Sequence, residues 1–213
     1  MSNSKPLSIF AGIVAAVSLL LLAFILFKEY SSIEIPMEAS TAVALFVSLL
    51  SVILFASFCQ LFSADAIVRS AGFTLFLSFV LEFFAAGLTG LPAAKSNYFI
   101  IALLAIAPIA SFILLVIGLF RIASIGGESK RFRTASKCFA IAKLVYLAII
   151  VGGSVLVAVS AMSTSEAENC EKLLAVLKTV FGSVIPSIAA CWFYWELSRW
   201  ITLRWDLHKE DYS

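Results

Sequence analysis

Charged residues are scarce in this chain. Asp, Glu, Lys and Arg make up only 13% of its 213 residues, whereas they make up about 25% of an ordinary soluble domain. Apolar residues make up 62%, and the mean hydropathy is +1.06. A soluble globular domain carries more charge than this, and a disordered chain carries far fewer apolar residues. The sequence therefore predicts an integral membrane protein.

Histidine is almost absent as well, since the chain contains only His208. One histidine cannot supply a bis-histidine haem site or a multi-histidine copper site. The sequence also lacks the phosphate-binding loop G-x-x-x-x-G-K-[ST], the zinc motif H-E-x-x-H and the nucleophile motif G-x-S-x-G. We therefore expect no catalytic residue, no bound metal and no cofactor, and we predict that the protein is not an enzyme.

Six apolar stretches are long enough to cross a bilayer. A hydrocarbon core of about 30 Å needs about 20 residues of helix, and a helix satisfies its own backbone hydrogen bonds in lipid. The stretches lack the strict alternation of a membrane β-barrel. We predict an all-α fold with a single transmembrane domain of six helices, followed by a cytoplasmic amphipathic tail over 196–213. The predicted helices cover residues 7–27, 41–63, 71–91, 99–121, 139–162 and 173–195.

Lysine and arginine predict the orientation, because basic connections stay in the cytoplasm. With the N-terminus inside, the opposite side receives only Lys28, Lys95 and Lys172. We therefore expect both termini to be cytoplasmic, in the cell membrane or an inner membrane. The cytoplasmic side then receives Lys5, Arg69, Arg121, Lys130, Arg131, Arg133, Lys137, Arg199, Arg204 and Lys209.

Four of these basic residues lie in one connection, over residues 126–137. Lys130, Arg131, Arg133 and Lys137 could contact anionic lipid headgroups, at about 1 kcal/mol for each basic residue. A plain anchor of the topology is the simpler interpretation. Nucleic-acid binding is not expected, because the formal net charge is only +2 and no nucleic-acid module is visible.

All four tryptophans gather at the end of the sixth predicted helix. Trp192, Trp195, Trp200 and Trp205 lie within fourteen residues. Amphipathic rings favour the headgroup level of a membrane, so we expect an aromatic belt at the inner interface. The helix is predicted to continue to about residue 207.

Two prolines fall inside predicted helices, Pro108 in the fourth and Pro186 in the sixth. Each proline removes one intrahelical hydrogen bond and is expected to kink its helix. A pair of interrupted helices can also mark the binding site of a transporter. The kink alone is the simpler interpretation.

Glu82 is the most informative single residue, since it lies near the middle of the third predicted helix. A charge at the bilayer midplane costs about 2.5–3.5 kcal/mol on insertion scales, so we expect Glu82 to be protonated or paired. Lys178 is the expected partner at a similar depth, whereas Lys143 is expected to extend to the inner face. Glu82 is either a proton- or cation-coupling group or a structural ion pair that fixes helix register.

Two functions remain open. We expect a non-catalytic subunit, or an accessory or assembly component, of a membrane complex, because the loops are short and catalytic clusters are absent. Its partners would be the lipid bilayer and other membrane subunits or further copies of the chain. The alternative is a small oligomeric transporter or channel that uses Glu82. A water-filled cavity around Glu82, Lys178 and serines would favour transport, whereas a dry core with an exposed face of small residues would favour a subunit.

Overall fold

The computed structural model describes residues 4–30, 37–89, 98–126, 129–160, 173, 177 and 180–210. No strand occurs among these residues, so the predicted all-α fold is confirmed for them. In chain order the helices are α1 (Ser4–Tyr30), α2 (Met37–Leu61), α3 (Ala66–Thr89), α4 (Tyr98–Ile125), α5 (Lys130–Ser160), the short π-helix η2 (Val180–Val184) and α7 (Ile185–Glu210).

Three stretches of the described helices are long and apolar enough to cross a membrane. They are Lys5–Phe24 in α1, Ala66–Phe84 in α3 and Ile106–Ile125 in α4. Leu45–Leu61 in α2 is a shorter apolar helix. These helices are compatible with membrane insertion, and the topology of six spans stays a prediction.

The connection before α5 is shorter than predicted. The sequence predicts a basic loop over 126–137, but the chain is helical from Lys130 onward. Ser129 caps this helix, because its Oγ accepts a hydrogen bond of 3.3 Å from the backbone N–H of Phe132. Phe132 and Phe139 lie seven residues apart on one face and are both buried. Capping and burial of this face explain why the basic residues are helical.

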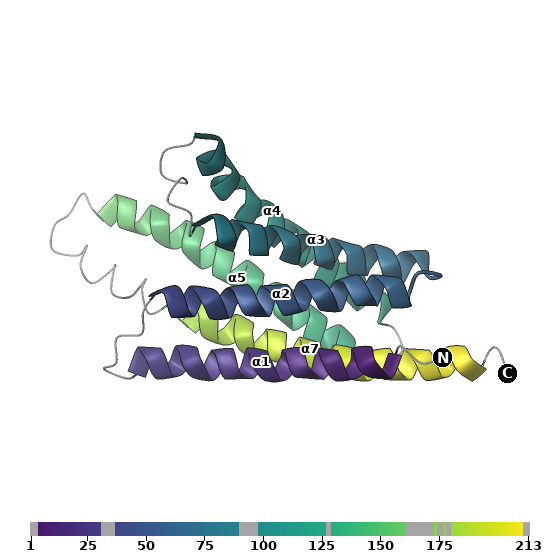
Figure 1. The fold of residues 1–213 in the computed structure, drawn as a ribbon. Coiled ribbons are helices and arrows are strands. Elements are labelled where there is room, and N and C mark those ends of the chain that lie inside the picture. The colour runs from purple at the N-terminus through teal and green to yellow at the C-terminus, as the bar shows by residue number, and fades with distance from the viewer. Residues whose placement is uncertain are drawn as a thin grey trace.

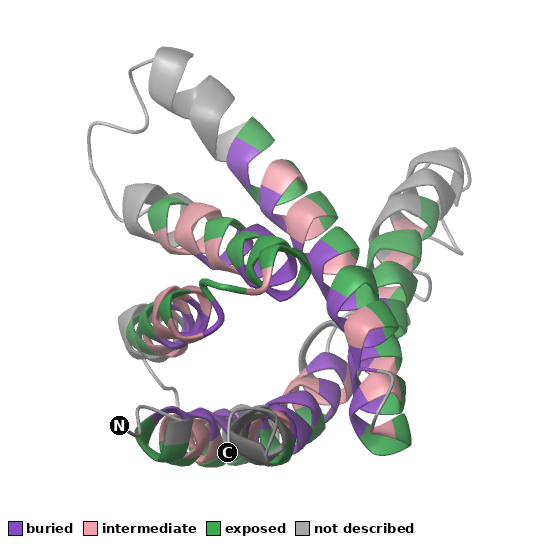
Figure 2. Ribbon diagram, turned by 90° about the vertical axis from the view of Figure 1, so that its right-hand side faces the viewer, coloured by how far each residue is buried: buried purple, intermediate pink, exposed green. Residues whose placement is uncertain are grey.

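Helices α1, α2, α3, α4, α5 and α7 form a ring in chain order, and the last helix closes it by packing against the first. Figure 2 looks along this ring and shows buried residues on its inner side and exposed residues on its outer side. The start of α1 and the end of α7 lie at the same end of the bundle (Figure 1). We call this the terminal end. The turn that joins α2 to α3, the end of α4 and the start of α5 also lie there.

The outer surface of the ring is apolar. On α4, for example, Ile106, Ile109, Ile113 and Ile117 follow one another at helical spacing, and all four are exposed. Large exposed apolar side chains also occur on α1, α2, α3, α5 and α7. Water would be a poor solvent for such a surface, whereas lipid tails suit it.

Reciprocal hydrogen bonds between serines join the two most closely packed helix pairs. Between α3 and α4, Ser78 Oγ donates to the Ser111 carbonyl at 2.9 Å, and Ser111 Oγ donates to the Ser78 carbonyl at 3.0 Å. Between α1 and α7, Ser8 Oγ donates to the Ser198 carbonyl at 2.9 Å, and Ser198 Oγ returns a bond of 2.7 Å. We call these the two serine clasps. Small polar residues are well suited to such contacts, because they let helix backbones approach closely.

Glycine allows the same close approach between α3 and α4. A Cβ added at Gly118 would lie 2.7 Å from both Cγ and Cδ2 of Leu75 and 3.2 Å from its backbone nitrogen. Since the nitrogen cannot move aside as a side chain can, α4 fits against α3 only without a side chain at this position.

We therefore expect Gly118→Ala to destabilise the protein. Overpacking typically costs about 1–3 kcal/mol, which outweighs the gain of up to about 1 kcal/mol from the better helix propensity of alanine. Gly152→Ala in α5 is the matched control, because a Cβ there would meet no atom within 4 Å. Thermal unfolding of the purified variants in detergent should show a lower midpoint for Gly118→Ala alone. Equal midpoints would show that α3 and α4 are not this close.

Candidate functional site

The candidate site is a cavity inside the ring, with a largely apolar wall that includes Glu82 and Lys143. Its volume is about 140 Å³, and all six helices of the ring contribute to its lining. Three serines, one tyrosine and the two ionisable side chains supply the polar groups. The lining residues are Ser18, Leu21, Val47, Ser48, Phe79, Glu82, Leu115, Phe139, Lys143, Pro186, Ser187, Ala190 and Tyr194. We call this the first cavity.

A second cavity, also of about 140 Å³, lies next to α4. Its lining consists of Glu82, Pro108, Ser111, Phe112, Leu115 and Lys143. Glu82, Leu115 and Lys143 therefore line both cavities. The carboxyl group and the amine lie at the boundary between the two spaces.

Glu82 and Lys143 lie at similar depth in the bundle. Glu82 is 16 residues after the start of α3, or about 24 Å at 1.5 Å per residue, and Lys143 is 13 residues after the start of α5, or about 20 Å. Both helices start at the terminal end. The two groups are therefore well inside the bundle.

Lys143 is half-buried and lines both cavities with Glu82. Its Nζ lies 5.9 Å from the centre of the Phe139 ring, one helical turn nearer the start of α5 and within the range of a cation–π contact. Extension of this side chain to the inner face, as expected from the sequence, stays a prediction. The side chain of Lys178, the partner predicted for Glu82, lies outside the described residues.

The two ionisable groups do not pair directly. Among the described residues, neither Glu82 nor Lys143 forms an ion pair with an N···O distance of 4.0 Å or less. A carboxyl group and an amine thus line one cavity without a direct ion pair between them.

The hydroxyl groups in and next to the site form hydrogen bonds with their own helices and with each other. Ser18 Oγ donates its proton to the Val14 carbonyl at 2.8 Å. Ser51 Oγ donates to the Val47 carbonyl at 2.9 Å and also lies 2.8 Å from the hydroxyl of Tyr194. Because serine has a single hydroxyl proton, Tyr194 must donate to Ser51. The oxygens of Ser18 and Tyr194 are left to accept hydrogen bonds.

Both prolines singled out in the sequence line a cavity. Pro186 is buried in the first cavity, at the second residue of α7, directly after the π-helix η2. The predicted interruption of this helix therefore takes the form of a π-helical segment, which accommodates the missing N–H of the proline. Pro108 lies inside α4 and lines the second cavity. The kink predicted there stays a prediction.

Aromatic side chains fill the ring between the first cavity and the terminal end. The centre of this aromatic layer is Trp200, whose ring lies 5.1 Å from Phe132 and 5.6 Å from Phe62. All six of its members are buried. They are Phe55, Phe58, Phe62, Phe132, Phe193 and Trp200. The aromatic layer thus separates the first cavity from the terminal end with large buried rings.

The aromatic layer corrects the predicted aromatic belt. Trp192 and Trp195 are exposed, as a belt requires, but only 1% of Trp200 is exposed. The side chain of Trp205 lies outside the described residues. Helix α7 runs without a break from Ile185 to Glu210, so Trp200 is on the inward face of a packed helix.

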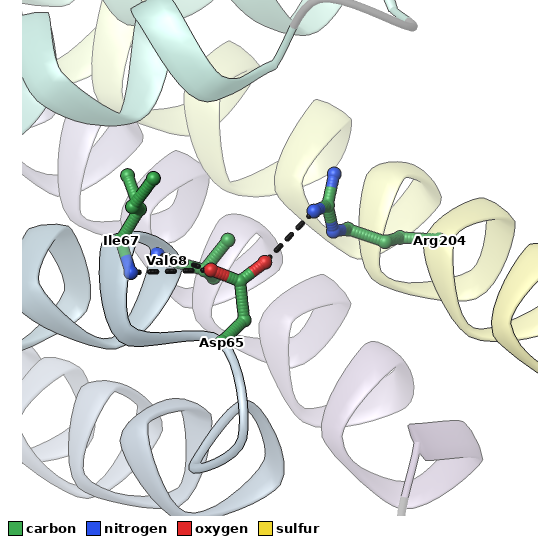
Figure 3. A network of polar contacts seen from close by, with 4 residues as sticks. All are labelled: Asp65, Ile67, Val68 and Arg204. Carbon is green, nitrogen blue, oxygen red and sulfur yellow. Dashed lines mark hydrogen bonds and ion pairs between the residues drawn. The ribbon is translucent and has the colours of Figure 1, made fainter.

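An ion pair ties the α2–α3 turn to α7 at the terminal end (Figure 3). Asp65 Oδ2 lies 2.9 Å from an Nη of Arg204. Asp65 Oδ1 accepts hydrogen bonds of 3.1 Å from the backbone N–H groups of Ile67 and Val68, and so caps the start of α3. The guanidinium of Arg204 lies 5.4 Å from the centre of the Trp200 ring, which connects this pair to the aromatic layer.

The four basic residues predicted to contact lipid headgroups lie at the start of α5, also at the terminal end. Lys130, Arg131 and Lys137 are exposed, whereas Arg133 is half-buried. Their contact with anionic lipid stays a prediction. Among the described residues, no group of three His, Cys, Asp or Glu side chains could hold a metal ion.

No family model, curated protein or solved structure matches this chain. The cavities and their ionisable groups are therefore the basis for a function.

Sequence reasoning finds Glu82 but misses most of its surroundings. Lys143 carries a signal, since it is a charged residue within the predicted span 139–162. Ser18, Ser48 and Tyr194 carry none, because serine and tyrosine are common in membrane helices. Only the packing of six helices brings them together.

The Asp65–Arg204 pair makes the stability of the protein depend on pH. Burial raises the pKa of Asp65. Hydrogen bonds from Val68, Arg204 and Ile67, together with the charge of Arg204, lower this pKa by a larger amount. The pKa of Asp65 in the folded protein is therefore below its usual value. A lowered folded-state pKa adds stability above the unfolded pKa of about 3.9, and this stability is lost as the pH falls through the folded-state pKa.

Asp65→Asn should keep the helix cap, because an amide oxygen also accepts hydrogen bonds, but lose the charge. We expect it to lower stability by about 1 kcal/mol or less at pH 7 and to have almost no effect near pH 2. Thermal unfolding of both proteins across this pH range measures the difference. A difference that stays constant with pH would contradict the ion pair.

Proposed function

We propose that this chain is a small multi-pass membrane transporter or channel in which Glu82 is the coupling group for a proton or small cation. The observation that carries the proposal is that Glu82 and Lys143 line both of two adjoining cavities. A carboxyl group at such a boundary can take up a proton or cation from one space and release it to the other. Intramembrane ionisable residues that face a cavity are typical of proton and ion pathways.

The lack of an ion-pair partner supports a functional interpretation of Glu82 over a structural one. A glutamate that fixes helix register would be expected to bind a fixed partner, because an unpaired charge within a membrane span is costly. Among the described residues Glu82 has no such partner within 4.0 Å. Its half-buried side chain instead lines two cavities.

The membrane topology belongs to the same proposal. We propose six spans with both termini in the cytoplasm of a cell or inner membrane. Basic residues at the terminal end support this orientation, among them Lys5, Arg69, Arg121, Lys130 and Arg131. The apolar outer surface supports burial in lipid and contact with further copies of the chain.

The subunit or assembly function predicted from the sequence takes second place. It was expected to accompany a dry core, whereas the ring contains two cavities with ionisable groups. The exposed apolar surface suits lipid as well as another subunit, so it favours neither function. The absence of enzymatic activity stays a prediction, and the proposed mechanism contains no catalytic step.

The test is the flux of protons and cations through the purified protein. In proteoliposomes with an imposed pH or sodium gradient and an internal fluorescent indicator, we expect flux well above that of empty liposomes. Glu82→Gln should reduce the flux to that of empty liposomes, because the amide cannot carry a proton or a charge.

Glu196→Gln is the matched control. Glu196 is a buried glutamate of the same bundle, but it pairs with Arg199 at 3.6 Å and does not line the first cavity. Its variant should retain flux. Full flux in a correctly assembled Glu82→Gln protein would rule out the coupling role.

A further inference from the structure

We propose that the first cavity binds a small zwitterion of amino-acid size, whose ammonium group pairs with Glu82 and whose carboxylate pairs with Lys143. The inference rests on the proposed transport function and names the class of solute that the site accepts. It does not require that the same solute be coupled to proton flux.

The charges of the site favour a zwitterion. Glu82 and Lys143 face one space from different helices, α3 and α5, without a direct ion pair. A ligand with one charge would neutralise one group and leave the other uncompensated. A ligand that carries both charges satisfies both groups through charge-assisted hydrogen bonds.

The size and polarity of the cavity limit the ligand further. An engineered apolar cavity of about 150 Å³ holds one benzene molecule, so a space of about 140 Å³ suits a ligand of only a few heavy atoms. The available oxygens of Ser18 and Tyr194 can accept the ammonium protons that Glu82 does not. The aromatic ring of Phe139 and the side chains of Leu21 and Val47 leave apolar wall for a small aliphatic group.

The test uses the full chain in lipid nanodiscs and radiolabelled glycine as the probe. Unlabelled alanine should compete with glycine, because it has the same charges and one more methyl group. Methylamine and acetate each carry one of the two charges and should compete about 10- to 100-fold more weakly, as expected for loss of a hydrogen bond to a charged group. Phenylalanine should compete poorly, because its ring exceeds the space.

A charge exchange separates binding at this pair from a general effect on folding. Glu82→Lys and Lys143→Glu should each abolish glycine binding, because the site then holds two like charges. The double variant Glu82→Lys/Lys143→Glu should recover binding, since a zwitterion can turn around in the exchanged site. Glu196→Gln should bind as the unmodified protein does.

Either result decides the inference. Binding of glycine that depends on both charges, and that the double variant restores, supports it. The absence of saturable glycine binding overturns it and indicates that the cavity takes no zwitterion. Competition by methylamine and acetate as strong as that by alanine also overturns it, because binding would then not require both charges. Because ion flux and its loss in Glu82→Gln are measured separately, failure here would leave the proposed transport function intact.

Discussion

Reciprocal hydrogen bonds between serines are the interaction on which this bundle depends. Lipid tails are as apolar as leucine, so apolar surface alone gives no reason for helices to associate in a bilayer. The clasp between Ser78 and Ser111 and the clasp between Ser8 and Ser198 supply a directional contact instead. Hydrogen bonds between membrane helices contribute about 0.6 kcal/mol each on average, and each clasp has two.

The two clasps belong to a ring of helices. They hold α3 against α4 and α1 against α7, and helices α2 and α5 connect the two pairs. Toward the terminal end the large side chains of the aromatic layer fill the ring, and the first cavity lies beyond them. Both small and large side chains line this cavity, among them Ser18, Pro186 and Phe139. The site thus depends on the packing of all six helices, each of which contributes to its wall.

The terminal end is joined by contacts of a different kind. Asp65 caps α3 with one oxygen and pairs with Arg204 through the other, and Arg204 in turn lies over Trp200. One carboxylate therefore connects a turn, a helix end and the aromatic layer. Neither Glu82 nor Lys143 takes part in these contacts at the terminal end. Both side chains line the cavities instead, which is in keeping with the proposed role in binding or transport.

The sequence by itself determined the helical fold, because long apolar stretches can satisfy their backbone hydrogen bonds in lipid only as helices or closed barrels. It also identified Glu82, since a carboxyl group in such a stretch is costly wherever it points. The tertiary structure alone decided that Lys143 lines the cavity, that Trp200 is buried rather than at an interface, and that the basic residues after Ser129 are helical. Depth along one helix predicts none of these, because each depends on which face packs inward. That choice is made by contacts between helices far apart in the chain.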